Sequence, residues 1–230
     1  MSDTYSDTRG QLEEYFDRTA SETWARLTSD APVSKIRQTV RAGRDRMRAT
    51  LLSRLPQNLH GCRVLDAGCG VGQMSVELAL RGADVVAVDI SPNLLDVART
   101  RTPREIAHRI DFSAGDMLSS DLGQFDHVIA MDSLIHYAPD DIVKALTELA
   151  RRTADSIQFT VAPRTPLLSA MHAVGKLFPR GDKSPAIQPI AEARLRKSCA
   201  SDPLLRRWNM PASERVKSGF YISQAMRLCR

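Results

Sequence analysis

Short apolar runs alternate with longer segments of helical periodicity through the middle of the chain. The apolar runs predict β-strands at 63–67, 84–88, 110–114, 125–130 and 156–161. Between them, apolar residues recur with a helical spacing at 71–81, 92–101 and 140–152. This alternation predicts an α/β domain with a mostly parallel sheet and right-handed crossovers. Residues that follow the carboxyl ends of such strands meet at one edge of the sheet, where ligands bind.

The N-terminal part of the chain does not follow this alternation. Residues 1–10 are polar and are predicted to be mobile. Helical patterns follow at 11–27 and at 33–55, and the second pattern is rich in arginine, which usually indicates a solvated face. We therefore expect residues 1–58 to form a helical cap and residues 59–230 to form the core.

The pattern changes again after residue 161. A turn leads to an apolar helix predicted at 167–178, a basic loop at 179–185 and a further helix at 190–199. The segments 205–211 and 218–228 alternate as strands that close the sheet, and the last is expected to be antiparallel. Residues 163–201 are therefore a predicted insertion between strands 5 and 6, beside the ligand-binding edge, where they help to form an acceptor pocket.

The strongest local signal is the glycine-rich turn after the first strand, VLDAGCGVG at 64–72. Its glycines, Gly68, Gly70 and Gly72, permit positive φ and let a ligand approach the backbone, and the next helix presents unpaired N–H groups. A dinucleotide fingerprint would read G-x-G-x-x-G, whereas this turn reads G-x-G-x-G after Asp66. The spacing disfavours NAD and resembles motif I of S-adenosylmethionine methyltransferases.

Two further matches follow in the order that this resemblance requires. Asp89 ends the second predicted strand about 20 residues past the turn, where a carboxylate accepts ribose hydroxyls. Asp116 and Met117 follow the third strand, and the resemblance implies that they bind the adenine amino group and pack on its ring. The full set of cofactor-binding residues that it implies is Asp66, Gly68, Gly70, Gly72, Asp89, Ile90, Asp116, Met117 and Met131.

Composition narrows the setting. The 230 residues fit one domain, with 43% hydrophobic and 26% charged residues, as in ordinary globular proteins. The net charge of +5 favours an anionic partner. The four cysteines form no C-x-x-C pair, so we expect reduced thiols and neither disulfides nor a protein-bound metal. No secretory signal or membrane-length apolar run is present, so we expect a cytoplasmic protein.

Four other segments resemble the magnesium-protoporphyrin IX O-methyltransferases of chlorophyll and bacteriochlorophyll biosynthesis. They are YFDRTASETWARL at 15–27, MDSLIHY at 131–137, FPRGDKSPAI at 178–187 and SGFYISQ at 218–224. The resemblance covers nearly the whole chain. It implies a Rossmann-like methyltransferase fold with a seven-stranded sheet and an N-terminal helical lid. It also implies methyl transfer from S-adenosylmethionine to one propionate of magnesium-protoporphyrin IX, with S-adenosylhomocysteine as the second product and magnesium carried by the substrate.

Within this resemblance, His136 and Tyr15 are the candidate catalytic residues. His136 follows the fourth strand and would hydrogen-bond the propionate or take a residual proton; the alternative is a structural histidine. Tyr15 would reach over the cofactor from the N-terminal helix, and helix packing is the alternative. The candidate substrate-binding residues are Tyr137, Arg164, Lys176, Arg180 and Lys183.

Other functions stay open at this point. The basic charge suits an RNA methyltransferase, but no N/D-P-P-Y-type tetrapeptide follows the fourth strand, so we expect no nucleic-acid partner. A non-catalytic module that delivers a porphyrin would use the same pocket. The resemblance further implies association with the large porphyrin-binding subunit of magnesium chelatase. The apolar segment 167–178 with its basic neighbours suggests peripheral contact with the photosynthetic membrane.

Overall fold

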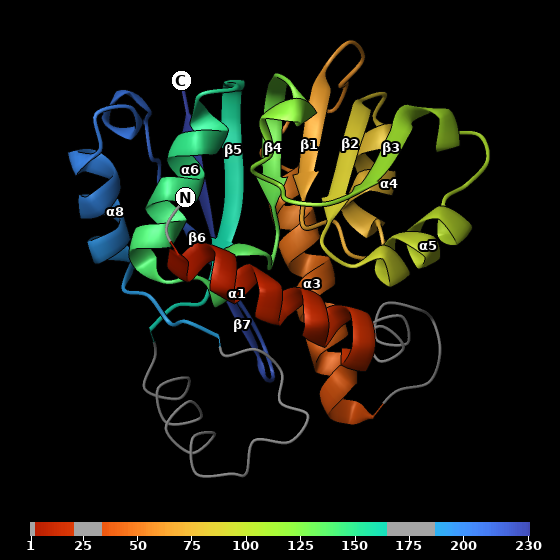
Figure 1. Ribbon diagram of the computed structural model, residues 1–230, viewed down its shortest axis with the longest axis horizontal. Helices are drawn as coiled ribbons and strands as arrows, with labels where there is room; N and C mark the ends of the chain where they lie inside the picture. The colour runs from red at the N-terminus through yellow and green to blue at the C-terminus, as the bar shows by residue number, and fades with distance from the viewer. Residues whose placement is uncertain (1–2, 21–33, 165–186) are drawn as a thin grey trace.

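The structure is a computed structural model that describes residues 3–20, 34–164 and 187–230. Its centre is a seven-stranded sheet with the strand order β3-β2-β1-β4-β5-β7-β6 (Figure 1). The strands are β1 (Arg63–Ala67), β2 (Asp84–Asp89), β3 (Ile110–Ala114), β4 (Phe125–Ala130), β5 (Thr153–Val161), β6 (Glu214–Ser218) and β7 (Tyr221–Cys229). The first five pair in parallel, and β7 is antiparallel to both β5 and β6. The mostly parallel sheet and the antiparallel last strand are thus confirmed.

Helices cover both faces of this sheet. They are α1 (Asp3–Glu14), α3 (Lys35–Leu52), α4 (Gln73–Leu80), α5 (Pro92–Arg101), α6 (Pro139–Ala150) and α8 (Glu192–Ser201). Short helical turns are η1 (Tyr15–Ala20), η2 (Ala107–Arg109), η3 (Ser120–Leu122), η4 (Leu134–His136) and η5 (Leu205–Arg207). Among the described residues, no helix is long and apolar enough to cross a membrane.

Alternate residues of the central strands supply two hydrophobic cores. Leu65 of β1 belongs to the core with α6 and α8, whereas its neighbour Val64 belongs to the core with α3, α4 and α5. Both side chains are fully buried, as expected for a parallel strand that is covered on both faces. The carboxyl ends of β1, β2 and β4 line the candidate site, and α1 crosses this edge of the sheet (Figure 1).

The prediction that the N-terminal segment is mobile is wrong for residues 3–10. Helix α1 begins at Asp3, and its side chains Tyr5 and Leu12 are each only 3% exposed. These two residues are seven apart, so they share one face of a helix and bury it against the larger core. The polar residues between them hide this pattern in the sequence.

The predicted strand at 205–211 is also wrong. Residues Leu205–Arg207 form a short 3-10 turn that buries Leu205, and only Asn209 makes an isolated bridge to Cys229. The edge strand is instead β6, whose side chains are mostly exposed apart from Val216. A charged edge strand that buries one side chain carries little hydrophobic signal, although it discourages edge-to-edge aggregation. The apolar helix predicted at 167–178 lies outside the described residues.

Candidate active site

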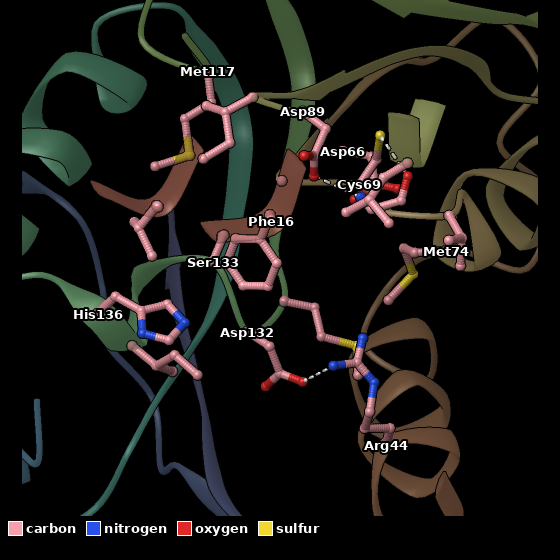
Figure 2. Close-up of a pocket in the computed structure, with 18 of the residues that line it drawn as sticks. Phe16, Arg44, Asp66, Cys69, Met74, Asp89, Met117, Asp132, Ser133 and His136 are labelled. Atoms are coloured by element: carbon pink, nitrogen blue, oxygen red, sulfur yellow. Dashed lines mark hydrogen bonds and ion pairs between the residues drawn. The ribbon is translucent and has the colours of Figure 1, made fainter. Parts of the chain in front are cut away.

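A cavity of about 320 Å³ opens at the carboxyl edge of the parallel strands (Figure 2). Its lining comes from the glycine turn after β1, the ends of β2 and β4, the helices α1 and α3, and the hairpin between β6 and β7. The larger part of its lining surface is apolar, as is usual for pockets that bind small molecules. Segments far apart in the sequence therefore share one cavity.

The glycine turn is held against β2 by its own backbone. The N–H groups of Gly68 and Cys69 donate to the carbonyl of Val88, at 2.8 and 3.0 Å. Gly68 and Gly70 have φ values of 81° and 54°, in the left-handed region. An added Cβ at Gly68 would lie 2.5 Å from the Cβ of Ser133, whereas one at Gly70 would meet nothing within 4 Å. Close packing against Ser133 therefore requires a glycine at position 68. At Gly70, which lines the cavity, the space next to the backbone is open.

Two buried carboxylates lie beneath this turn. Asp89 accepts hydrogen bonds from the N–H groups of Gly70 (2.7 Å) and Ser91 (3.0 Å). Burial raises its pKa, and these bonds oppose the rise. Asp66 accepts the hydroxyl of Ser75 at 2.5 Å, and burial raises its pKa to about 7 against that bond. Both carboxyl groups line the cavity, where hydroxyl donors of a ligand would offset the cost of burial.

Helix α1 reaches the third predicted carboxylate, Asp116. The Tyr5 hydroxyl donates to one Asp116 oxygen at 2.9 Å, and the Arg9 guanidinium pairs with the other at 3.1 Å. The Tyr5 ring stacks on Tyr137, with centroids 4.7 Å apart. Sequence reasoning missed Tyr5 and Arg9 because it treated their segment as mobile. The spacing from Tyr5 to Leu12 was the signal that could have found the helix.

The two candidate catalytic residues take different places. His136 lies on η4 after β4, lines the cavity, is 9% exposed, and meets the ring of Phe16 edge-on at 6.1 Å. Tyr15 is half-buried and packs edge-on against Phe16 at 5.2 Å, and it is Phe16 that lines the cavity. The structure thus places His136 in the site and Tyr15 beside it, and the catalytic role of each stays a prediction.

The remaining predicted residues divide in the same way. Those that line the cavity are Ile90, Met117, Met131 and Tyr137. Gly72 lies outside the lining and caps α4 with a φ of 75°. Arg164 is exposed, does not line the cavity, and donates its backbone N–H to Ile190. The other predicted substrate-binding cations, Lys176, Arg180 and Lys183, lie outside the described residues.

A polar cluster that the sequence did not single out lies at the other end of the cavity. Arg44 of α3 forms an ion pair with Asp132 at 3.1 Å, and the Tyr221 hydroxyl donates to the same carboxylate at 3.0 Å. Asp132 lies two residues after the end of β4, with Met131 between them. Arg44 could not be distinguished in the sequence from the other arginines of its helix. Within the described parts of the chain, no three potential ligands gather to hold a metal ion.

Comparisons with known proteins agree with this geometry. A protein-family model described as "Magnesium-protoporphyrin IX methyltransferase C-terminus" matches residues 130–230, and the family model of a general methyltransferase domain matches residues 64–156. A crystal structure of the magnesium protoporphyrin IX methyltransferase from Synechocystis PCC 6803 with bound SAH is 28% identical. It superposes with a TM-score of 0.80 over 96% of this chain and 99% of that chain.

Similar full-length sequences extend the match. The magnesium-protoporphyrin O-methyltransferase of Synechocystis is 30% identical over 86% of this chain and 87% of its own length. The Rhodobacter capsulatus magnesium-protoporphyrin O-methyltransferase is 54% identical over 227 residues, which is 98% of both chains. The chain therefore belongs to the magnesium-protoporphyrin O-methyltransferase family, and its fold is the Rossmann-like S-adenosylmethionine methyltransferase fold.

Proposed function

We propose that this protein transfers the methyl group of S-adenosylmethionine to one propionate carboxylate of magnesium-protoporphyrin IX. The products are the monomethyl ester and S-adenosylhomocysteine. One observation carries the proposal: a single cavity joins the G-x-G-x-G turn and Asp89 to the His136 segment and the apolar walls around it. The turn supplies a cofactor site, and the walls supply an acceptor site beside it.

The residues of the cofactor end fit S-adenosylmethionine. Open space lies where side chains of Gly70 and Gly115 would stand, so a ligand can lie against the backbone there. The buried Asp89 carboxylate suits the ribose hydroxyls. Asp116 accepts from Tyr5, Arg9 and the Leu118 N–H, and a carboxylate has about four lone-pair sites, so one is left for the adenine amino group.

The reaction needs alignment more than it needs a base. A propionate has a pKa near that of Glu, ~4.3, so it is ionised at pH 7 without help. S-adenosylmethionine supplies an electrophilic methyl group, whose bond to sulfur breaks as the carboxylate oxygen bonds to it, and sulfur keeps the electron pair. Correct positioning of two such reactants can supply about 7–11 kcal/mol.

We propose that His136, which lines the cavity, holds the reacting carboxylate. The apolar wall would raise the pKa of a carboxyl group that enters the cavity and so favour its neutral, unreactive form. A hydrogen bond from the His136 ring favours the ionised form and fixes the direction of one oxygen. Tyr137, which is 4% exposed and lies next in the chain, packs on Tyr5 and limits how the segment can move.

Turnover tests this function directly. Purified protein is incubated with S-adenosylmethionine and, in separate reactions, magnesium-protoporphyrin IX, metal-free protoporphyrin or an RNA pool, and product mass is followed together with S-adenosylhomocysteine. We expect one methyl group on the magnesium porphyrin and a loss of about tenfold to a hundredfold in His136→Ala, as for one hydrogen bond to a charged group. The exposed His108 provides the control variant His108→Ala, which should keep full activity.

Each alternative gives a different result in the same experiment. Methylated RNA without methylated porphyrin would contradict the proposed acceptor. Tight porphyrin binding with no transfer would indicate a delivery module. If His136→Ala turns over normally, the reaction stands and the assigned role of His136 fails.

We also propose that the N-terminal helices act as a lid over residues 59–230. The contacts of Tyr5 and Arg9 with Asp116, and of Arg44 with Asp132, support this arrangement. Limited proteolysis tests it: S-adenosylhomocysteine should protect the segment Asp3–Glu14 from cleavage. Equal cleavage with and without the ligand would contradict closure.

Two finer proposals concern the setting of the enzyme in the cell. We propose that the substrate arrives from the large porphyrin-binding subunit of magnesium chelatase, because the macrocycle is poorly soluble. We also propose that the protein works in the cytoplasm, in peripheral contact with the photosynthetic membrane. The net charge of +5 supports attraction to an anionic surface. Sedimentation with anionic vesicles tests the membrane contact, and protein left wholly in the supernatant would contradict it. A pull-down with the chelatase subunit tests the other partner.

A further inference from the structure

The polar cluster around Asp132 lies at the end of the cavity that the proposed function assigns to the acceptor. In the view of Figure 2, Arg44, Asp132 and His136 lie below the Phe16 ring, whereas Asp66 and Asp89 lie above it. Arg44 and Asp132 both line the cavity, with side chains 20% and 9% exposed. In this view the charge pair and the two buried carboxylates therefore lie on opposite sides of the Phe16 ring.

Asp132 is held in a conformation that ordinary residues avoid. Its φ is 57°, and among the described residues no other non-glycine residue has a positive φ. Its N–H donates to the Thr160 hydroxyl at 2.7 Å, and its carboxylate accepts from Tyr221. Burial and the nearby Asp132 charge raise the pKa of Tyr221, so this phenol keeps its proton and stays a donor. Strain that surrounding contacts maintain in this way is typical of functional sites.

Helix α3 is pressed against the hairpin that carries Tyr221. An added Cβ at Gly43 would lie 2.6 Å from Cδ1 of Tyr221, so only glycine allows this approach. Ser218 donates its hydroxyl to the carbonyl of Thr39, one helical turn earlier. Because Arg44 follows Gly43, these contacts fix where the guanidinium enters the cavity.

Arg44 lies with Asp132 at the end of the cavity that the proposed function assigns to the acceptor. Among the described residues that line it, Arg9 is paired with Asp116 at the cofactor end, and Arg48 is paired with Asp45. The Asp132 ion pair orients the Arg44 guanidinium, and a guanidinium carries N–H donors in a fork that suits a carboxylate. Val40, Phe220 and Ile187 line the same cavity and supply apolar surface for a flat ring.

We propose that Arg44, aimed by Asp132 and Tyr221, binds the propionate of the substrate that does not react, and so selects porphyrins with a second carboxylate. The proposal rests on the proposed function and names the substrate contact within it. An ion pair to the reacting propionate would be lost as the ester forms, and so would oppose the reaction. A pair to the other propionate is kept in the ground state, the transition state and the product.

Three magnesium porphyrins test this assignment. The diacid substrate and the monomethyl ester product each keep a free propionate for Arg44, and the dimethyl ester has none. Their dissociation constants are measured by fluorescence quenching in the presence of S-adenosylhomocysteine. The wild-type protein should bind the diacid and the product with similar affinity, and the dimethyl ester about tenfold to a hundredfold more weakly, as expected for a charge-assisted hydrogen bond.

The variant Arg44→Met should remove this difference while leaving the affinity for the dimethyl ester unchanged. Arg44→Lys should keep part of it, because an ammonium group lacks the fork geometry. Asp132→Asn should also keep part of it, because the amide can keep the contacts with Thr160 and Tyr221 but loses the charge that aims Arg44. Calorimetric binding of S-adenosylhomocysteine checks that each variant is folded. The exposed Arg46 gives the matched control Arg46→Met on the same helix, which should behave as wild type.

Steady-state kinetics add a second readout. Because the contact is the same in the ground and transition states, Arg44→Met should raise KM for the diacid and leave kcat nearly unchanged. An equal loss of affinity for all three porphyrins would mean that Arg44 only shapes the pocket. A product that binds wild-type protein as weakly as the dimethyl ester would mean that Arg44 holds the reacting propionate. Either result overturns the proposal while methyl transfer by the wild-type protein stands.

Discussion

At the scale of single residues, local chemistry fixes the glycine turn and the carboxylates beneath it. Gly68 and Gly70 need positive φ, and Asp66 and Asp89 stand at the ends of apolar runs. The place of Arg44 in the cavity could not be predicted from the sequence, because it depends on Asp132, a partner far away in the chain. The positive φ of Asp132 could not be predicted from its residue type either, because aspartate adopts this conformation only occasionally.

Asp66 makes a testable contribution to stability. Burial raises its pKa to about 7, well above the value of an exposed carboxyl group. The unfolded chain therefore gives up this proton at lower pH than the folded protein, and stability is lost as pH rises from about 4 through 7. Asp66→Asn removes the ionisation, so it should raise the melting temperature of the ligand-free protein at pH 8 more than at pH 4.5.

Thermal melts across this pH range measure the effect, and each kcal/mol corresponds to ~2–4 °C for a domain of this size. Asp111 is exposed, so Asp111→Asn is the control and should change neither melting temperature nor its pH dependence. A shift for Asp66→Asn that is equal at both pH values would mean that its ionisation does not limit stability.

At the scale of elements, hydrophobic periodicity predicted the helices and strands that bury many side chains in the core. It failed for those that bury only one or two. The five parallel strands and their helices were found because both of their faces carry apolar residues. Helix α1 was missed because two buried residues, Tyr5 and Leu12, hold it. Strand β6 was misplaced because Val216 is its one buried side chain. Helix α1 lines the cavity, and β6 leads into the hairpin that lines it.

Helix α1 should slow the release of the cofactor product. Its Tyr5 hydroxyl holds the helix on Asp116, at the end of the cavity assigned to adenine. Tyr5→Phe keeps the stacking on Tyr137 and removes this one hydrogen bond, so S-adenosylhomocysteine should dissociate about two- to tenfold faster. Stopped-flow displacement measures the rate. The exposed Ser6 gives the control Ser6→Ala, and an unchanged rate in Tyr5→Phe would show that α1 does not cover the ligand.

Helix α3 depends on Gly43 for its close approach to Tyr221. The added methyl group of Gly43→Ala has no room, so helix or ring must move, which typically costs ~1–3 kcal/mol. Gly10 lies in α1 with nothing within 4 Å of an added Cβ, so Gly10→Ala should instead stabilise by about 1 kcal/mol. Urea unfolding compares the two variants. A Gly43→Ala protein as stable as Gly10→Ala would contradict the tight contact.

At the scale of the whole molecule, the sequence order of glycine turn, acids and histidine segment was sufficient to predict the fold and the edge where they meet. Parallel strands bring their carboxyl ends together whatever lies between them, so Asp89 and His136 share a cavity. The wall of the cavity that α3 and the hairpin of β6 and β7 form could not be predicted in the same way. It forms where α3 meets the hairpin of β6 and β7, a contact between distant parts of the chain.

The central claim is transfer of one methyl group to a propionate oxygen. The most direct measurement uses S-adenosylmethionine with a trideuterated methyl group and magnesium-protoporphyrin IX in a single turnover, followed by mass spectrometry before and after mild alkaline hydrolysis. We predict one labelled methyl group per porphyrin, formed together with S-adenosylhomocysteine and removed by hydrolysis as expected for an ester. A label that survives hydrolysis, or a porphyrin that gains no label while the protein binds S-adenosylmethionine, would contradict the account.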